Sequence, residues 1–170
     1  MIHTMNIDKF TQATLCFLVK GNEVLLAEKQ KKLGAGFLNG FGGKYEIEDK
    51  TIEQTNAREV EEEVKVIVKS AKKMGEMIFR NPSDDDVLKN MVVHIFIATK
   101  WEGDPIETDE MKKIAWYKIS DLDYDKFLSA DRLFIPQILS GKCVKGIVEY
   151  DDNWQVKSSQ IDEVDFNQLN

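Results

Sequence analysis

Hydrophobic residues of this chain fall into short runs separated by polar turns, except near residues 51–66, where they recur with a helical spacing. Short apolar runs bounded by Gly, Pro, Asn or Asp are typical of β-strands. We therefore predict strands at 11–19, 24–28, 74–79, 91–98, 114–117 and 141–150, and allow for an edge strand at 154–156.

The helical segment has a recognisable start and a buried stripe. Thr51 and Gln54 fit a capping box, in which the two side chains satisfy free backbone N–H groups. At about 100° per residue, Ala57, Val60 and Val64 share one face, which we expect to be buried. A shorter helix is predicted over 133–139, capped from 129–131. Strands on both sides of one long helix, with a later helix, predict an α+β layered fold with a mixed sheet.

Composition places the chain among ordinary soluble proteins. Its 170 residues predict a single domain, 1–170, with a polar tail from about 151. The net charge of −7 argues against a nucleic-acid polymer or an anionic membrane surface as partner. No signal peptide and no apolar run of ~20 residues is evident, so we expect a cytoplasmic monomer or homodimer. Cys16 and Cys143 are interpreted as buried free thiols.

Candidate chemistry is concentrated in a glycine-rich turn and the helix after it. The turn, 40–44 (GFGGK), offers a backbone that can approach phosphates closely. On the helix, Glu59, Glu62 and Glu63 share one side, while Glu61 points to solvent. Oxygen ligands in such a cluster suit Mg²⁺ or Mn²⁺. For the helix alone, a solvated acidic face is an equal alternative, and the acidic segment 81–86 is interpreted as a solvated turn.

Together these residues resemble the Nudix box, G-x5-E-x7-R-E-U-x-E-E-x-G-U with U aliphatic, over about 43–66. The matching positions are Gly43, Arg58, Glu59, Val60, Glu62, Glu63 and Val66. Three departures stand out: one residue is inserted between Gly43 and the helix, Lys50 stands where the first glutamate would align, and Lys65 replaces the last glycine. The resemblance implies a Nudix α/β/α sandwich with a central mixed β-sheet.

Beyond the box, the segment from about Thr14 to Glu149 resembles the MutT-like oxidised purine nucleoside triphosphatases, the 8-oxo-dGTP diphosphatase type. The resemblance implies an additional metal ligand at Glu110 and a backbone ligand at the Gly42 carbonyl. It implies that the substrate is bound by Thr14, Lys29, Asn39, Phe41, Gly42, Gly43, Lys44, Phe79, Met91 and Asp131. Two positions depart from this pattern: Ala130 stands in place of the second aspartate of a pair, and Leu128 in place of a base-stacking tryptophan.

The leading hypothesis is therefore a Mg²⁺-dependent nucleoside triphosphate pyrophosphohydrolase that releases a monophosphate and pyrophosphate. Glu59, Glu62 and Glu63 would be catalytic, holding metal that neutralises the polyphosphate and activates water, and Arg58 would orient them. An alternative is a Nudix pyrophosphatase for another nucleoside diphosphate-X substrate, such as a nucleotide sugar or ADP-ribose. A third hypothesis is a Nudix-like module that binds a nucleotide without hydrolysing it. Base preference, the number of metals and the general base stay open.

Overall fold

A computed structural model describes residues 7–32, 34–81 and 90–169. Residues 82–86 of the predicted acidic turn lie outside the described part of the chain. The strands are β1 Thr11–Lys20, β2 Glu23–Lys29, β3 Leu38–Asn39, β4 Ile67–Arg80, β5 Met91–Glu102, β6 Met111–Lys118, β7 Cys143–Tyr150 and β8 Val156–Val164. The α-helices are α1 Ile52–Val64 and α2 Ile135–Leu139, and single 3₁₀ turns occur at Ile7–Lys9, Ile119–Asp121, Tyr124–Lys126, Asp131–Leu133 and Phe166–Gln168.

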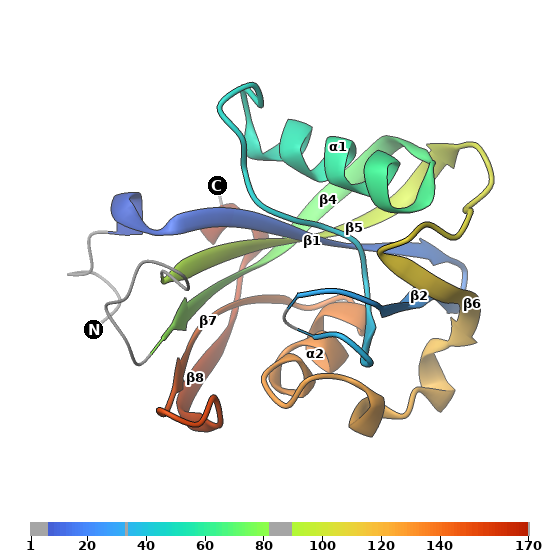
Figure 1. The fold of residues 1–170 in the computed structure, drawn as a ribbon. Coiled ribbons are helices and arrows are strands. Elements are labelled where there is room, and N and C mark those ends of the chain that lie inside the picture. The colour runs from blue at the N-terminus through green and yellow to red at the C-terminus, as the bar shows by residue number, and fades with distance from the viewer. Residues whose placement is uncertain (1–6, 33, 82–89, 170) are drawn as a thin grey trace.

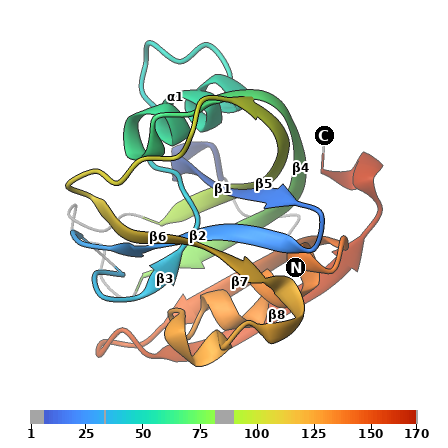
Figure 2. The same ribbon diagram turned by 90° about the vertical axis from the view of Figure 1, so that its right-hand side faces the viewer.

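The strands form one mixed sheet in the order β3-β2-β1-β5-β4-β7-β8, with β6 paired to β2 outside this path. The pairs β1–β5 and β4–β7 are parallel, and the other pairs are antiparallel. Helix α1 covers one face of the sheet and α2 lies on the other (Figure 1). Viewed from the side, β6 runs along β2, between the two helical layers (Figure 2). The predicted layered α+β fold with a mixed sheet is confirmed.

Two hydrophobic clusters, one on each face of the sheet, hold these layers together. Along β1, Cys16 and Leu18 belong to the cluster beneath α1, whereas Leu15 and Phe17 belong to the cluster beneath α2. A strand buried on both faces explains why the sequence shows a continuous apolar run there rather than an alternation. Both cysteines are buried and unpaired, as predicted.

The sequence pattern underestimates the lengths of β4 and β8, in which many side chains are exposed. β4 begins at Ile67 rather than at residue 74, because 67–73 pairs with the end of β5 although most of its side chains are exposed. β8 covers Val156–Val164 rather than 154–156 for the same reason: its residues are largely exposed and its backbone pairs with β7. Backbone pairing of this kind leaves no hydrophobic periodicity in the sequence.

The start of α1 agrees with the prediction, with one change of partner. Thr51 Oγ1 accepts from the Gln54 N–H at 3.2 Å, while Gln54 Oε1 accepts from the N–H of Lys50 at 2.9 Å, one residue before the cap. On the inner face, Asn56 is buried and Ala57 only half-buried, so the buried stripe is rotated from the predicted one.

The second helix is shorter than predicted. It covers Ile135–Leu139, preceded by the 3₁₀ turn Asp131–Leu133, and no side chain caps either start. Pro136 in its first turn favours a helix start at this point, since the ring lacks the N–H that a longer helix would require there. No helix in the described part of the chain is both long enough and apolar enough to cross a membrane.

Candidate active site

The glycine turn passes close to β1 and to α1 at the same time. The Gly42 N–H donates to Glu63 Oε2 at 2.8 Å, and the Gly43 carbonyl accepts from the Thr14 N–H at 2.8 Å. A Cβ at Gly42 would overlap the Thr14 backbone, and one at Gly43 would overlap the Glu59 carboxylate. Both positions therefore require glycine for close approach rather than for an unusual φ.

Arg58 holds the carboxylates on the outer side of α1. Its Nη1 donates to Glu59 Oε1 at 2.9 Å and to Glu62 Oε2 at 3.3 Å. Its other nitrogens bind Asp49, with Nε to Oδ1 at 2.9 Å and Nη2 to Oδ2 at 2.7 Å. Nη2 also donates to the Lys44 carbonyl at 3.0 Å. The guanidinium thus orients two glutamates while being fixed by the preceding loop, the orienting role expected of Arg58.

Glu63 is the buried member of the glutamate set. Only 5% of it is exposed, whereas 60% of the Glu62 side chain is exposed. Burial raises the pKa of Glu63 to about 7, and the neighbouring Glu59 and Glu110 carboxylates act in the same direction. The Gly42 N–H and the Lys29 ammonium oppose this shift. Burial also raises the pKa of Glu59, against the effect of Arg58.

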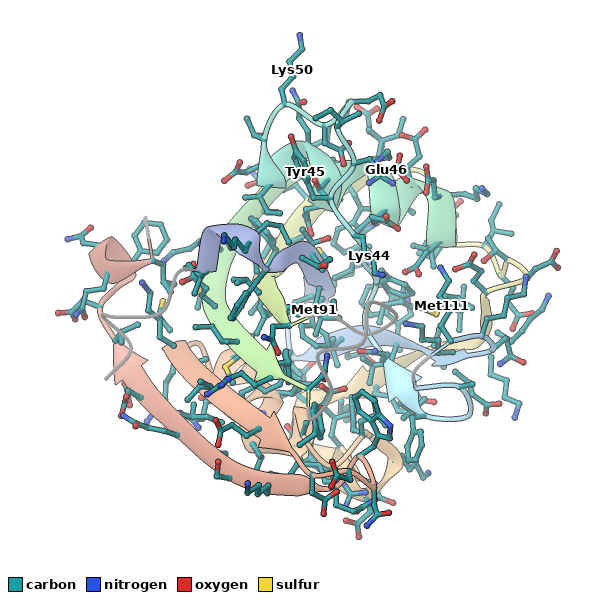
Figure 3. The ribbon with its side chains drawn as sticks, turned by 60° about the vertical axis from the view of Figure 1, so that its left-hand side comes forward. Lys44, Tyr45, Glu46, Lys50, Met91 and Met111 are labelled. Atoms are coloured by element: carbon teal, nitrogen blue, oxygen red, sulfur yellow. The ribbon has the colours of Figure 1, made fainter. Side chains whose placement is uncertain are left out.

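A loop before β6 brings Glu110 toward this helix. Thr108 Oγ1 donates to the Glu63 carbonyl at 2.9 Å, and the Gln30 N–H donates to the Glu110 carbonyl at 2.9 Å. Met111 is buried directly after Glu110 and starts β6, and it lies below and to the right of Lys44 in Figure 3. These contacts explain how a carboxylate far from α1 in sequence influences the pKa of Glu63.

Two polar residues expected to recognise the base come from separate segments, β3 and the 3₁₀ turn Asp131–Leu133. Asn39 ends β3, and its Oδ1 accepts from the Gly40 N–H at 2.9 Å. Asp131 is buried, which raises its pKa to about 7, and Lys29 at the end of β2 opposes that shift. Because Lys29 also lowers the pKa of Glu63, its ammonium acts on both carboxylates.

The apolar residues expected there are paired on neighbouring strands. Phe79 near the end of β4 is opposite Met91 at the start of β5, and both are half-buried. Met91 lies near the centre of the face shown in Figure 3. Thr14 on β1 is 4% exposed, and its Oγ1 has no hydrogen-bond partner in the described part of the chain.

One residue of the expected set, Phe41, lies in the core. Phe41 is fully buried in the cluster beneath α1, and its backbone N–H and carbonyl both pair with Cys16. Lys44, two residues after Gly42, is exposed, on the segment between the sheet and α1 (Figure 3).

The donors fit a hard divalent cation by their chemistry. Within residues 7–32, 34–81 and 90–169, no three His, Cys, Asp or Glu side chains are grouped as a ready metal cluster. Glu59 and Glu62 are instead held by Arg58, and Glu63 by Gly42. All expected ligand atoms are oxygens, which Mg²⁺ and Mn²⁺ prefer, and the absence of a side chain at Gly43 lets the Glu59 carboxylate lie against the turn.

Comparison with known proteins assigns the family. The NUDIX domain model matches residues 9–138. The chain belongs to the Nudix family. Over 152 residues it is 34% identical to the oxidized purine nucleoside triphosphate hydrolase of Danio rerio and 32% identical to that of Mus musculus, in each case covering 89% of this chain and 94% of the relative. The crystal structure of MutT from Bacillus halodurans superposes with a TM-score of 0.76 at 24% identity, covering 90% of this chain and 98% of that one. This protein is therefore a Nudix hydrolase with the expected fold.

The first acid of this Nudix box is Asp49, not a residue aligned at Lys50. Asp49 follows Gly43 with the five-residue spacing of the box, so the inserted residue lies after Asp49 rather than before it. Its carboxylate also accepts from the Thr55 hydroxyl at 2.9 Å and the Glu46 N–H at 3.1 Å. Hydrogen bonds from Arg58 hold the pKa of Asp49 well below its usual range. Lys50 instead projects outward from the molecule (Figure 3). The spacing from Gly43 was the signal that the sequence interpretation missed.

At the end of the box, Lys65 occupies a position suited to glycine. It caps α1 in the left-handed conformation, with φ 63°, and its N–H donates to the Glu61 carbonyl at 3.0 Å. Lys65 Nζ donates to the Glu62 carbonyl at 3.0 Å. The side chain thus adds a hydrogen bond to the helix end in a conformation that is strained for residues other than glycine.

Proposed function

We propose that this Nudix hydrolase is a Mg²⁺-dependent nucleoside triphosphate pyrophosphohydrolase that acts on oxidised purine nucleotides such as 8-oxo-dGTP, releasing the monophosphate and pyrophosphate. The observation that carries the proposal is the set of three α1 glutamates beside the glycine turn, where the Gly42 N–H donates to Glu63 Oε2 at 2.8 Å and Arg58 donates to Glu59 and Glu62. A nucleotide whose phosphates lie at this end would have its base toward Asn39, directly before the turn. Two relatives above 30% identity bear the name of this activity.

At the phosphate end, Glu59, Glu62, Glu63 and Glu110, with the Gly42 carbonyl, would hold Mg²⁺, or Mn²⁺ in its place. When bound, the metal supplies positive charge to the polyphosphate and activates water. Arg58 keeps Glu59 and Glu62 directed to the same side, because its Nη1 donates to Glu59 Oε1 at 2.9 Å and to Glu62 Oε2 at 3.3 Å. Lys29 and the exposed Lys44 add positive charge for the phosphates of the substrate in a protein whose net charge is −7.

At the base end, Asn39 offers its side-chain amide, with Oδ1 already oriented by Gly40. An amide that both donates and accepts suits a purine edge. Phe79 and Met91 provide apolar surface for the base, and Asp131 provides a carboxyl whose raised pKa lets it act as donor or acceptor near neutral pH.

A second candidate function is hydrolysis of another nucleoside diphosphate-X substrate. The residues at Ala130 and Leu128 favour it, because an aspartate pair and a base-stacking tryptophan are missing there. A module that only binds nucleotide is less consistent with the site, since such a module has no need for the three α1 glutamates and the guanidinium that orients them.

The decisive experiment is a pyrophosphate-release assay with Mg²⁺ that compares 8-oxo-dGTP, 2-hydroxy-dATP, dGTP and dATP, with ADP-ribose hydrolysis followed alongside. Preference for an oxidised purine supports the proposal. Cleavage of ADP-ribose alone would replace it with the second candidate, and binding of nucleotide without turnover of any substrate would support the binding module.

A further inference from the structure

Asp131 lacks the polar neighbour that an aspartate at position 130 would provide. Ala130 is 1% exposed and carries no polar side-chain atom, so Asp131 has no second carboxyl next to it in the chain. Tyr150, at the end of β7, is instead close enough for the charge of Asp131 to affect the pKa of its phenol. Burial and the charge of Asp131 both raise the pKa of Tyr150, so its hydroxyl stays protonated at neutral pH.

A row of aromatic rings fixes Tyr150 at this place. Its ring stacks on Phe79, with ring centroids 6.3 Å apart, and packs against the Trp154 ring, with ring centroids 5.9 Å apart. Phe79 also meets the edge of Phe134 at 6.2 Å. Phe134 closes the turn that starts at Asp131, its N–H donating to the Asp131 carbonyl at 3.3 Å. These ring contacts therefore connect Tyr150 to the turn that carries Asp131, although the two residues lie on different elements.

Both groups are available to a ligand. In the described part of the chain, neither the Tyr150 hydroxyl nor the Asp131 carboxyl makes a hydrogen bond to another residue, although Asp131 is 9% exposed and Tyr150 is half-buried. Polar groups removed from water without a partner reduce stability, so a free pair at such a position is typical of a binding site.

We propose that Tyr150 is a base-recognition residue, whose hydroxyl, together with Asp131, supplies the second polar group that Ala130 lacks. This inference rests on the proposed function and specifies its substrate. The Tyr150 hydroxyl can donate as well as accept, and the Asn39 amide can donate through Nδ2 while its Oδ1 already accepts from the Gly40 N–H. Donors available from both side chains would favour the carbonyl oxygen of an oxopurine over the exocyclic amine of adenine. Tyr150 would therefore favour oxopurine triphosphates.

The test is Tyr150→Phe in the full chain, which retains the ring and its stacking and removes only the hydroxyl. We expect kcat/KM for 8-oxo-dGTP and dGTP to fall about tenfold, while kcat/KM for dATP changes less than about threefold. Removing the hydroxyl leaves the base oxygen of the oxopurines without its hydrogen bond, whereas dATP has no oxygen at that position to lose one. Tyr124→Phe, which removes another half-buried phenol at a different place, is the matched control and should leave all three unchanged.

Binding of 8-oxo-dGMP, measured by calorimetry without metal, gives a second readout and should weaken by a similar factor. An equal fall in kcat/KM for all three substrates, or no fall for any of them, would overturn the role of Tyr150 while leaving the proposed function intact. A wild-type enzyme inactive on every purine triphosphate would overturn both, so the two failures are distinguishable.

Discussion

Asp49 and Arg58 form a two-point ion pair, with Arg58 Nε and Nη2 at 2.9 and 2.7 Å from the two carboxylate oxygens of Asp49. The pair joins the loop before α1 to the helix that carries the glutamates. Because the remaining nitrogen of Arg58 binds Glu59 and Glu62, the loop sets the direction of the metal-binding side chains indirectly.

Breaking this pair should affect both stability and activity. Asp49→Asn removes the buried negative charge that pairs with Arg58. We expect the free energy of unfolding to fall by about 1–3 kcal/mol, as for a lost charge-assisted hydrogen bond. The rate should fall as well, because Arg58 would no longer be fixed. Urea denaturation and the pyrophosphate assay measure the two effects. Glu48→Gln, one residue earlier and exposed, should show neither; a stable and fully active Asp49→Asn would contradict the role of the pair.

Glu62→Gln tests the metal-site assignment with little risk to the fold. Its side chain is 60% exposed, so an isosteric change should leave the melting temperature nearly unchanged. We expect the rate to fall by orders of magnitude, because a carboxylate ligand is replaced by a neutral amide. Glu61→Gln is the matched control, since Glu61 is the exposed neighbour on the same helix. Near-full activity of Glu62→Gln would remove this residue from the proposed site.

Lys65→Gly should stabilise the protein. Lys65 holds φ 63°, a conformation that costs residues other than glycine roughly 1 kcal/mol. Part of this gain is offset by the loss of the hydrogen bond from Nζ to the Glu62 carbonyl. Lys65→Ala separates the two effects, because it loses the hydrogen bond and keeps the strain, so it should be less stable than wild type. Thermal denaturation of the three proteins checks this order, and an Ala variant as stable as the Gly variant would refute it.

Asp131 should make stability depend on pH. Burial raises its pKa in the folded state to about 7, above the ordinary value of 3.8, so the folded state holds a proton that the unfolded chain releases. Stability therefore falls as pH rises from about 4 to 7, by up to about 1.4 kcal/mol per pH unit. Asp131→Asn removes this dependence, so the variant should gain stability relative to wild type between pH 5 and pH 8.

Urea denaturation at several pH values measures this difference. Glu63, whose pKa is also raised, contributes with the same sign in both proteins, so the difference between them isolates Asp131. Asp152→Asn, at an exposed position, should follow the wild-type curve. Parallel curves for wild type and Asp131→Asn would show that the carboxyl is not held in its protonated form.

Local sequence patterns predicted more of the fold than of the site. Thr51 caps α1 as the sequence predicts, and the apolar runs identify strands such as β1 and β5, because capping and strand formation depend on neighbouring residues. β8 was underestimated because exposed side chains carry no periodic signal when only backbone pairing holds the strand.

What the sequence by itself determined is the family, the longer elements and the set of acids on α1, since the spacing of residues along one helix fixes which side chains share a face. Only the tertiary structure decided that Glu63 is buried while Glu62 is exposed, that Phe41 belongs to the core, and that Tyr150 stacks on Phe79. Those relationships depend on sheet register and on how α1 and the turn at Asp131 pack against it. Burial and pairing between distant segments arise from that packing, and no local pattern encodes them.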